Sequence, residues 1–123
     1  MQSKLTLPKD TTVPNHIAMI LDGNRRWARS KGLLTLLGHK AGFEAGMKIA
    51  EAARSWGVHT FTVWGFSTEN WDRSPKEISY LMKLYKGMAR EVEKRADKEQ
   101  IRFVHLGRKD DLPVSLVKVF TDL

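Results

Sequence analysis

The chain has 123 residues, of which 41% are hydrophobic and 28% charged, so it forms one globular domain at most and is not disordered throughout. It contains no cysteine, which excludes a disulfide scaffold, a thiolate metal site and a Cys nucleophile. Its formal net charge of +7 favours anionic partners without choosing among nucleic acid, phosphorylated small molecules and acidic lipid.

Residues 1–15 are expected to form a mobile tail, because they hold Pro8 and Pro14 and show no apolar periodicity. The tail lacks the apolar core of a signal peptide, and no apolar run in the chain approaches the length that spans a bilayer. We therefore expect a cytoplasmic protein, with peripheral contact to a membrane left open.

Short apolar runs and amphipathic segments alternate after the tail. Residues 16–21 suit a buried parallel strand, and a helix follows and ends at Gly32. A second helix is predicted over residues 39–56, with Gly57 as its C-cap, and a second strand over residues 58–66.

The rest of the chain predicts helix, strand and helix. Ser74 can cap a helix in which Pro75 takes the first position and Glu77 completes a capping box. Its apolar stripe between residues 78 and 92 is expected to be core, although the same stripe could wall an apolar cavity. A third strand is predicted over residues 101–106, and another helix opens at Asp111-Leu112-Pro113.

Alternating strands and helices predict an α/β fold with a parallel sheet flanked by helices. Three strands are few for such a sheet, and the last helix has no cap before Leu123. We therefore expect residues 16–123 to be the N-terminal part of one incomplete domain.

Polar clusters follow the first two predicted strands, where ligands bind in open α/β sheets. In the first cluster, Gly23 allows a tight turn, and Arg25, Arg26 and Arg29 carry donors suited to phosphate oxygens. An aspartate beside a phosphate needs a cation between them, so Asp22 is a candidate Mg²⁺ ligand. The alternative is that Asp22 caps the helix and the arginines form a solvated face.

Other polar and aromatic residues leave both interpretations open. His39 at a helix start suits either a cap or a phosphate donor. Asn70 suits either turn chemistry or contact with a reacting group. Trp27 and Trp71 are more often packing residues than ligand contacts.

Taken together, these segments resemble the cis-prenyltransferases, the undecaprenyl diphosphate synthase family. The resemblance rests on HIAMILDGNRRWA at residues 16–28, GHKAG at 38–42, and FSTENWDR at 66–73 leading into SPKE. It implies a Mg²⁺-dependent transferase that condenses isopentenyl diphosphate with an allylic diphosphate such as farnesyl diphosphate, forming cis double bonds. It further implies a homodimer, a parallel sheet with helices around an apolar tunnel, and a product that associates with membranes.

The resemblance also implies roles for individual residues. Asp22 would be a catalytic residue and the metal ligand, and Asn70 would stand at the proton-acceptor position. Substrate contacts would come from Gly23, Asn24, Arg25, Arg26, Trp27, His39, Ser67, Thr68, Glu69, Trp71 and Arg73.

The sequence departs from the family pattern in two ways. Thr35 stands where the family usually has an arginine, four residues before His39. The stretch that binds isopentenyl diphosphate, and a glutamate that shares the metal, are not found before Leu123. The alternative to an enzyme is therefore a non-catalytic relative that binds a prenyl diphosphate or a partner subunit. No nucleic-acid motif is present, and no nucleic-acid partner is expected.

Overall fold

The computed structural model describes residues 6–65 and 72–122. The chain divides into two compact units, Met1–Glu69 and Asn70–Leu123, and each is described by itself. The first unit holds β1 (His16–Ile20), α1 (Asn24–Ser30), α2 (Thr35–Ser55) and β2 (Thr60–Trp64), and the second holds α3 (Pro75–Glu99) and α4 (Val114–Asp122).

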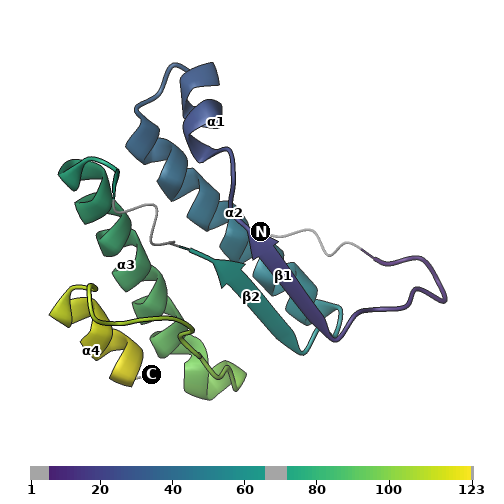
Figure 1. The fold of residues 1–123 in the computed structure, drawn as a ribbon. Coiled ribbons are helices and arrows are strands. Elements are labelled where there is room, and N and C mark those ends of the chain that lie inside the picture. The colour runs from purple at the N-terminus through teal and green to yellow at the C-terminus, as the bar shows by residue number, and fades with distance from the viewer. Residues whose placement is uncertain (1–5, 66–71, 123) are drawn as a thin grey trace. The chain divides into compact units, whose positions relative to one another are not determined.

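The two strands of the first unit pair in parallel and lie side by side in Figure 1. The register sets His16 opposite Thr60 and Ile20 opposite Trp64. The His16 imidazole Nε2 lies 2.8 Å from the Thr62 hydroxyl and links neighbouring strands. Both helices of the unit stand between the strands in sequence, as a parallel pair requires. The expected α/β fold with parallel strands is confirmed.

Positive φ angles at two glycines allow the chain to turn after the helices of the first unit. Gly32 (φ 66°) follows α1, and Gly57 (φ 93°) follows α2 and donates its N–H to the Arg54 carbonyl. Between the helices, Leu33 N–H donates to the Ala28 carbonyl at 2.9 Å, and the Ala28 side chain is completely buried. The connection between α1 and α2 is therefore short and folded back onto α1.

The second unit is built on the packing of α4 against the apolar stripe of α3. Ser74 caps α3, because its hydroxyl accepts the Glu77 N–H at 3.2 Å, as predicted. The predicted stripe is buried, which places it in the core; the buried residues of the two helices are Leu81, Met82, Tyr85, Ala89, Leu116 and Val119. Burial raises the pKa of the Tyr85 phenol to about 12, and the positive charge of Arg73 lowers it in part.

The prediction of a third strand over residues 101–106 is wrong for this structure. The segment follows α3 and pairs with no strand among the described residues. Its burial nevertheless alternates with the period of a strand: Phe103 and His105 are half-buried, whereas Val104 and Leu106 are exposed. Apolar alternation predicted the direction of the side chains, but a strand also needs a neighbour for its backbone hydrogen bonds.

Element boundaries differ modestly from the predictions. α2 begins at Thr35, four residues earlier than expected, and β2 covers only Thr60–Trp64. The N-cap of α2 is Leu34, which makes no side-chain capping bond, so no cap signal marked this start. No described helix is long and apolar enough to cross a membrane.

Candidate functional site

The candidate site begins at the turn between β1 and α1. Gly23 has φ 88° and ψ 6°, a left-handed conformation that strains any residue with a side chain. Its carbonyl accepts the Trp27 N–H at 2.9 Å, which starts α1 immediately after the turn. The turn thus places Asp22 at the carboxyl end of β1 and the arginines of α1 directly beyond it.

A carboxylate and a guanidinium lie together at this turn. Arg26 Nη2 is 3.4 Å from Asp22 Oδ2, and the side chains are 78% and 81% exposed, respectively. Water screens such a pair, so it adds little to the stability of the fold. The two groups are therefore available to ligands: the carboxylate to a cation and the guanidinium to an anion.

Asn24 and α2 approach each other very closely. A β-carbon on Gly42 would clash with the Asn24 side-chain amide, with Cγ only 2.7 Å away. A β-carbon on Gly38 would clash with the backbone carbonyl of Asn24 and stand 3.0 Å from Ala28 Cβ. A β-carbon on Gly46 would stand 3.6 Å from the Leu21 side chain, which is an ordinary van der Waals contact. One face of α2 therefore has no side chains where the turn crosses it.

The other predicted residues of the first unit differ in exposure. His39 is 5% exposed, so its imidazole belongs largely to the interior of the unit. Arg25 is half-buried, whereas Trp27 is 43% exposed. The family resemblance implies substrate contacts for all three. The structure joins Asp22 and Arg26 directly and brings Asn24 against α2.

The second predicted cluster is described only at its end. Ser67, Thr68, Glu69, Asn70 and Trp71 lie outside the described residues. Arg73 belongs to the second unit, where its Nη1 lies 3.7 Å from Glu77 Oε1, with 29% and 11% of the two side chains exposed. The structure therefore gives no geometry between the two clusters, and their joint site stays a prediction.

The residues of the first turn suit a magnesium ion that is held partly by the protein and partly by a substrate phosphate. No group of three or more His, Asp or Glu side chains gathers within residues 6–65 and 72–122. Mg²⁺ commonly takes one or two carboxylates together with substrate phosphate oxygens and water. The exposed Asp22 carboxylate, next to a guanidinium that suits phosphate, matches that arrangement.

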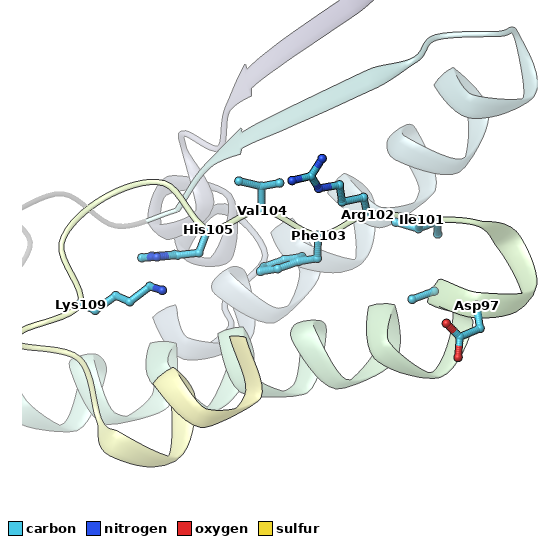
Figure 2. A pocket seen from close by; sticks show the side chains of 8 residues that line it. Asp97, Ile101, Arg102, Phe103, Val104, His105 and Lys109 are labelled. Atoms are coloured by element: carbon cyan, nitrogen blue, oxygen red, sulfur yellow. The ribbon is translucent and has the colours of Figure 1, made fainter. Parts of the chain in front are cut away.

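The second unit holds a hollow of about 530 Å³ that no sequence motif indicates. Figure 2 shows Phe103, His105 and Lys109 at this hollow, which extends to Asp97 near the end of α3. Phe103 and His105 both stack on Phe120, with ring centroids 5.3 and 4.7 Å apart. Burial, and then the charge of Lys109, lower the pKa of His105. The only sequence signal was the alternation of residues 101–106.

Comparison with known proteins places the chain in a family. Residues 20–123 match the family described as "Putative undecaprenyl diphosphate synthase". The chain belongs to this family. It is 42% identical over 109 residues to an isoprenyl transferase of Fusobacterium nucleatum, covering 89% of this chain and 47% of the relative. It is 37% identical over 121 residues to dehydrodolichyl diphosphate synthase 2 of Arabidopsis thaliana, covering 96% and 39%.

A solved structure agrees with the family assignment. Lavandulyl diphosphate synthase from Lavandula x intermedia, in complex with dimethylallyl diphosphate, superposes with a TM-score of 0.83 at 33% identity. The match covers 89% of this chain and 47% of that one. The members of this family are enzymes. The chain spans about two fifths to one half of the length of the curated relatives described above.

Proposed function

We propose that the chain carries the allylic-diphosphate half of a Mg²⁺-dependent cis-prenyltransferase site. The whole reaction would condense isopentenyl diphosphate with an allylic diphosphate such as farnesyl diphosphate. The observation that supports the proposal is the exposed Asp22–Arg26 pair at the Gly23 turn, at the end of a parallel strand. Membership of the prenyltransferase family, and a structural relative that holds dimethylallyl diphosphate, support the same substrate class.

The residues of the turn would act by charge. As the allylic carbon–oxygen bond breaks, negative charge develops on the departing diphosphate, and the guanidinium groups of Arg25 and Arg26 would stabilise it. Because Asn24 is packed against Gly42, its part would be to hold the turn in place. A rigid turn keeps the charged donors aligned without reorganisation during the reaction.

Asp22 would hold the magnesium ion. The ion, when bound, would supply Lewis-acid stabilisation of the diphosphate oxygens. Asp22 would also keep Arg26 oriented towards the same ligand, since the two side chains lie 3.4 Å apart. His39, Trp27 and Arg73 would add substrate contacts.

The roles of Ser67, Thr68, Glu69, Asn70 and Trp71 rest on the resemblance of the STENW segment. Asn70, or a diphosphate oxygen, would accept the proton lost after the new carbon–carbon bond forms. The homodimer implied by the family and the cytoplasmic location expected from the sequence are likewise proposals.

Binding without chemistry is the second candidate function. The chain spans 47% of the Fusobacterium nucleatum relative and 39% of the Arabidopsis thaliana one, so binding and turnover by this stretch are measured separately. Residues that contact isopentenyl diphosphate in the family are expected outside this stretch. On this view the chain holds a prenyl diphosphate, or pairs with a partner, and little turnover is expected from it alone.

Calorimetric titration with farnesyl diphosphate, with and without Mg²⁺, tests the shared part of both proposals. We expect Mg²⁺-dependent binding that weakens about tenfold or more in Arg26→Ala, because a charge-assisted contact to phosphate is lost. Asp22→Asn should remove the Mg²⁺ dependence. Arg90→Ala, which removes an exposed arginine on α3, is the matched control and should bind like the original chain. Equal binding by all four proteins would overturn the proposal.

Incorporation of labelled isopentenyl diphosphate into butanol-soluble product then separates catalysis from binding. Product that appears with the original chain and disappears with Asp22→Ala would establish turnover by these residues. Binding without product would support the half-site.

A further inference from the structure

The hollow in the second unit has a wall of aromatic rings that packing holds in place. Phe103 and His105 line it, and each ring stacks on Phe120 of α4, with interplanar angles of 24° and 16°. Because both rings are packed against the same partner, the wall is formed before any ligand enters. The volume of about 530 Å³ is within the range of pockets that hold small organic molecules.

Two cationic side chains at the hollow have no ion-pair partner in the described part of the chain. They are Arg102 and Lys109, and both are exposed. The neighbouring Arg108, which does not line the hollow, is paired, since its Nη2 lies 3.2 Å from Asp110 Oδ2. Unpaired cations beside an apolar wall favour an anionic ligand over a neutral one.

A third polar group at the hollow also lacks a partner. His105 Nδ1 is buried, and no described residue forms a hydrogen bond with it, whereas buried polar atoms are nearly always hydrogen-bonded. The Lys109 side chain extends towards this imidazole in Figure 2, and its charge acts on the ring. An ammonium group, and an imidazole whose Nδ1 carries a proton, would both donate to the oxygens of an anion.

We propose that the hollow binds a small organic anion, with its charged oxygens at the Lys109 end and a planar apolar body along Phe103. Figure 2 shows Asp97 on the side opposite Lys109, where its carboxylate would repel an anion and so set the direction of the ligand. Arg102 would add a second cationic contact. Carboxylates and phosphate esters share the required chemistry, because guanidinium and ammonium groups bind the oxygens of either.

A metal cation fits this hollow less well than an organic anion. Asp97 is the one carboxylate that lines it, and two cationic side chains stand at the same hollow. The proposal goes beyond the proposed prenyltransferase function and does not rest on it. No residue of the hollow belongs to the turn after β1 or to the STENW segment.

Titration of the chain, followed by NMR signals of the aromatic side chains, tests the proposal. The probes are naphthoate, naphthyl phosphate and naphthylmethanol, which share an apolar body, and only the first two are anions. We expect the two anions to shift the ring signals of Phe103 and His105, with dissociation constants of about 1 mM for ligands of this size. Naphthylmethanol should bind about tenfold more weakly or not at all. The tighter of the two anions identifies the ligand as a carboxylate or a phosphate ester.

Two neighbouring variants separate a site from general attraction to a basic protein. Lys109→Ala should weaken the binding of both anions about tenfold, because a charge-assisted contact is lost. Arg108→Ala removes the same charge from the adjacent residue, whose side chain is 81% exposed, and should bind like the original chain. Both side chains are exposed, so neither variant threatens the fold.

Four results would overturn the proposal. They are equal weakening by Lys109→Ala and Arg108→Ala, equal binding of naphthylmethanol and the anions, no ring shifts at about 10 mM probe, and shifts confined to the turn after β1. The last result would place the probes at the proposed diphosphate site instead. Calorimetric titration of the same variants with farnesyl diphosphate is a separate measurement that Lys109→Ala should leave unchanged, so failure of either proposal is recognised by itself.

Discussion

The side chain of Asn24 occupies the space that a β-carbon on Gly42 would need. The amide carbon Cγ of Asn24 would be 2.7 Å from that β-carbon, closer than unstrained atoms approach. This contact ties the turn after β1 to the middle of α2. The position of Asp22 and Arg26 therefore depends on a residue that carries no side chain.

Gly42→Ala is expected to destabilise the chain by about 1–3 kcal/mol, as overpacked interiors do. In an Asn24→Ala background the amide is gone, so the same change should be neutral or stabilising, since alanine favours a helix by up to about 1 kcal/mol. Urea unfolding of the four proteins in this cycle measures the coupling. Equal destabilisation by Gly42→Ala in both backgrounds would contradict the contact.

Two further glycines act as controls for that cycle. Gly38→Ala meets the backbone carbonyl of Asn24, so Asn24→Ala should not rescue it. Gly87→Ala, in α3, meets no atom within 4 Å and should stabilise the chain by about 0.5–1 kcal/mol. Rescue of Gly38→Ala by Asn24→Ala would show that the turn shifts as a whole.

Thr35→Arg is expected to strengthen allylic diphosphate binding several-fold. Thr35 begins α2, one helical turn before His39, at the position where the family usually carries an arginine. A guanidinium there would add a charge-assisted contact to the diphosphate. Titration with farnesyl diphosphate measures the effect. An unchanged dissociation constant would show that an arginine at position 35 does not strengthen allylic diphosphate binding.

Ser74→Ala should lower the free energy of unfolding by about 1 kcal/mol, because the Glu77 N–H loses its cap. Ser74→Asp keeps an acceptor at the same place and should retain most of the stability. Thermal unfolding of the three proteins tests this. If alanine and aspartate prove equally destabilising, the hydroxyl oxygen is not what supports the start of α3.

Stability at alkaline pH should report on Tyr85. Its pKa is raised to about 12, whereas an unfolded tyrosine titrates near 10. The contribution of the protonated Tyr85 phenol to the free energy of unfolding is thus complete below pH 10. It is lost as the pH rises from 10 to 12, by roughly 3 kcal/mol at most. The free energy of unfolding of Tyr85→Phe should change less with pH than that of the original chain over this range. Parallel curves would show that the buried phenol does not drive the loss.

Local signals predicted most of the helices and strands. The cap at Ser74 and the glycines at positions 32 and 57 mark helix ends, and they do so because caps and left-handed turns depend on neighbouring residues only. The start of α2 was missed because Leu34 caps nothing with its side chain. Residues 101–106 were assigned to a strand, since alternation does not reveal whether a partner strand lies alongside.

The sequence indicates which residues form the candidate site, but it does not indicate how they contact one another. The clustering of Asp22 with arginines was visible in the sequence, and the structure confirms that Asp22 and Arg26 are neighbours. Asn24 was predicted to contact the diphosphate, a role that stays a prediction, whereas its packing against Gly42 was not foreseen. That contact joins residues 18 positions apart, and no local pattern encodes how closely two helices approach.

The extended segment after α3 has a kinetic consequence. Backbone amides in β1 and β2 are held in a ladder, so their hydrogens exchange with solvent only when the sheet opens. Residues 102–106 have no such ladder with any other described segment, although Phe103 and His105 are anchored by stacking on Phe120. Their amide hydrogens should therefore exchange within the time typical of an unstructured peptide, while the neighbouring aromatic rings stay fixed. The segment would combine an ordered side-chain face with an unprotected backbone.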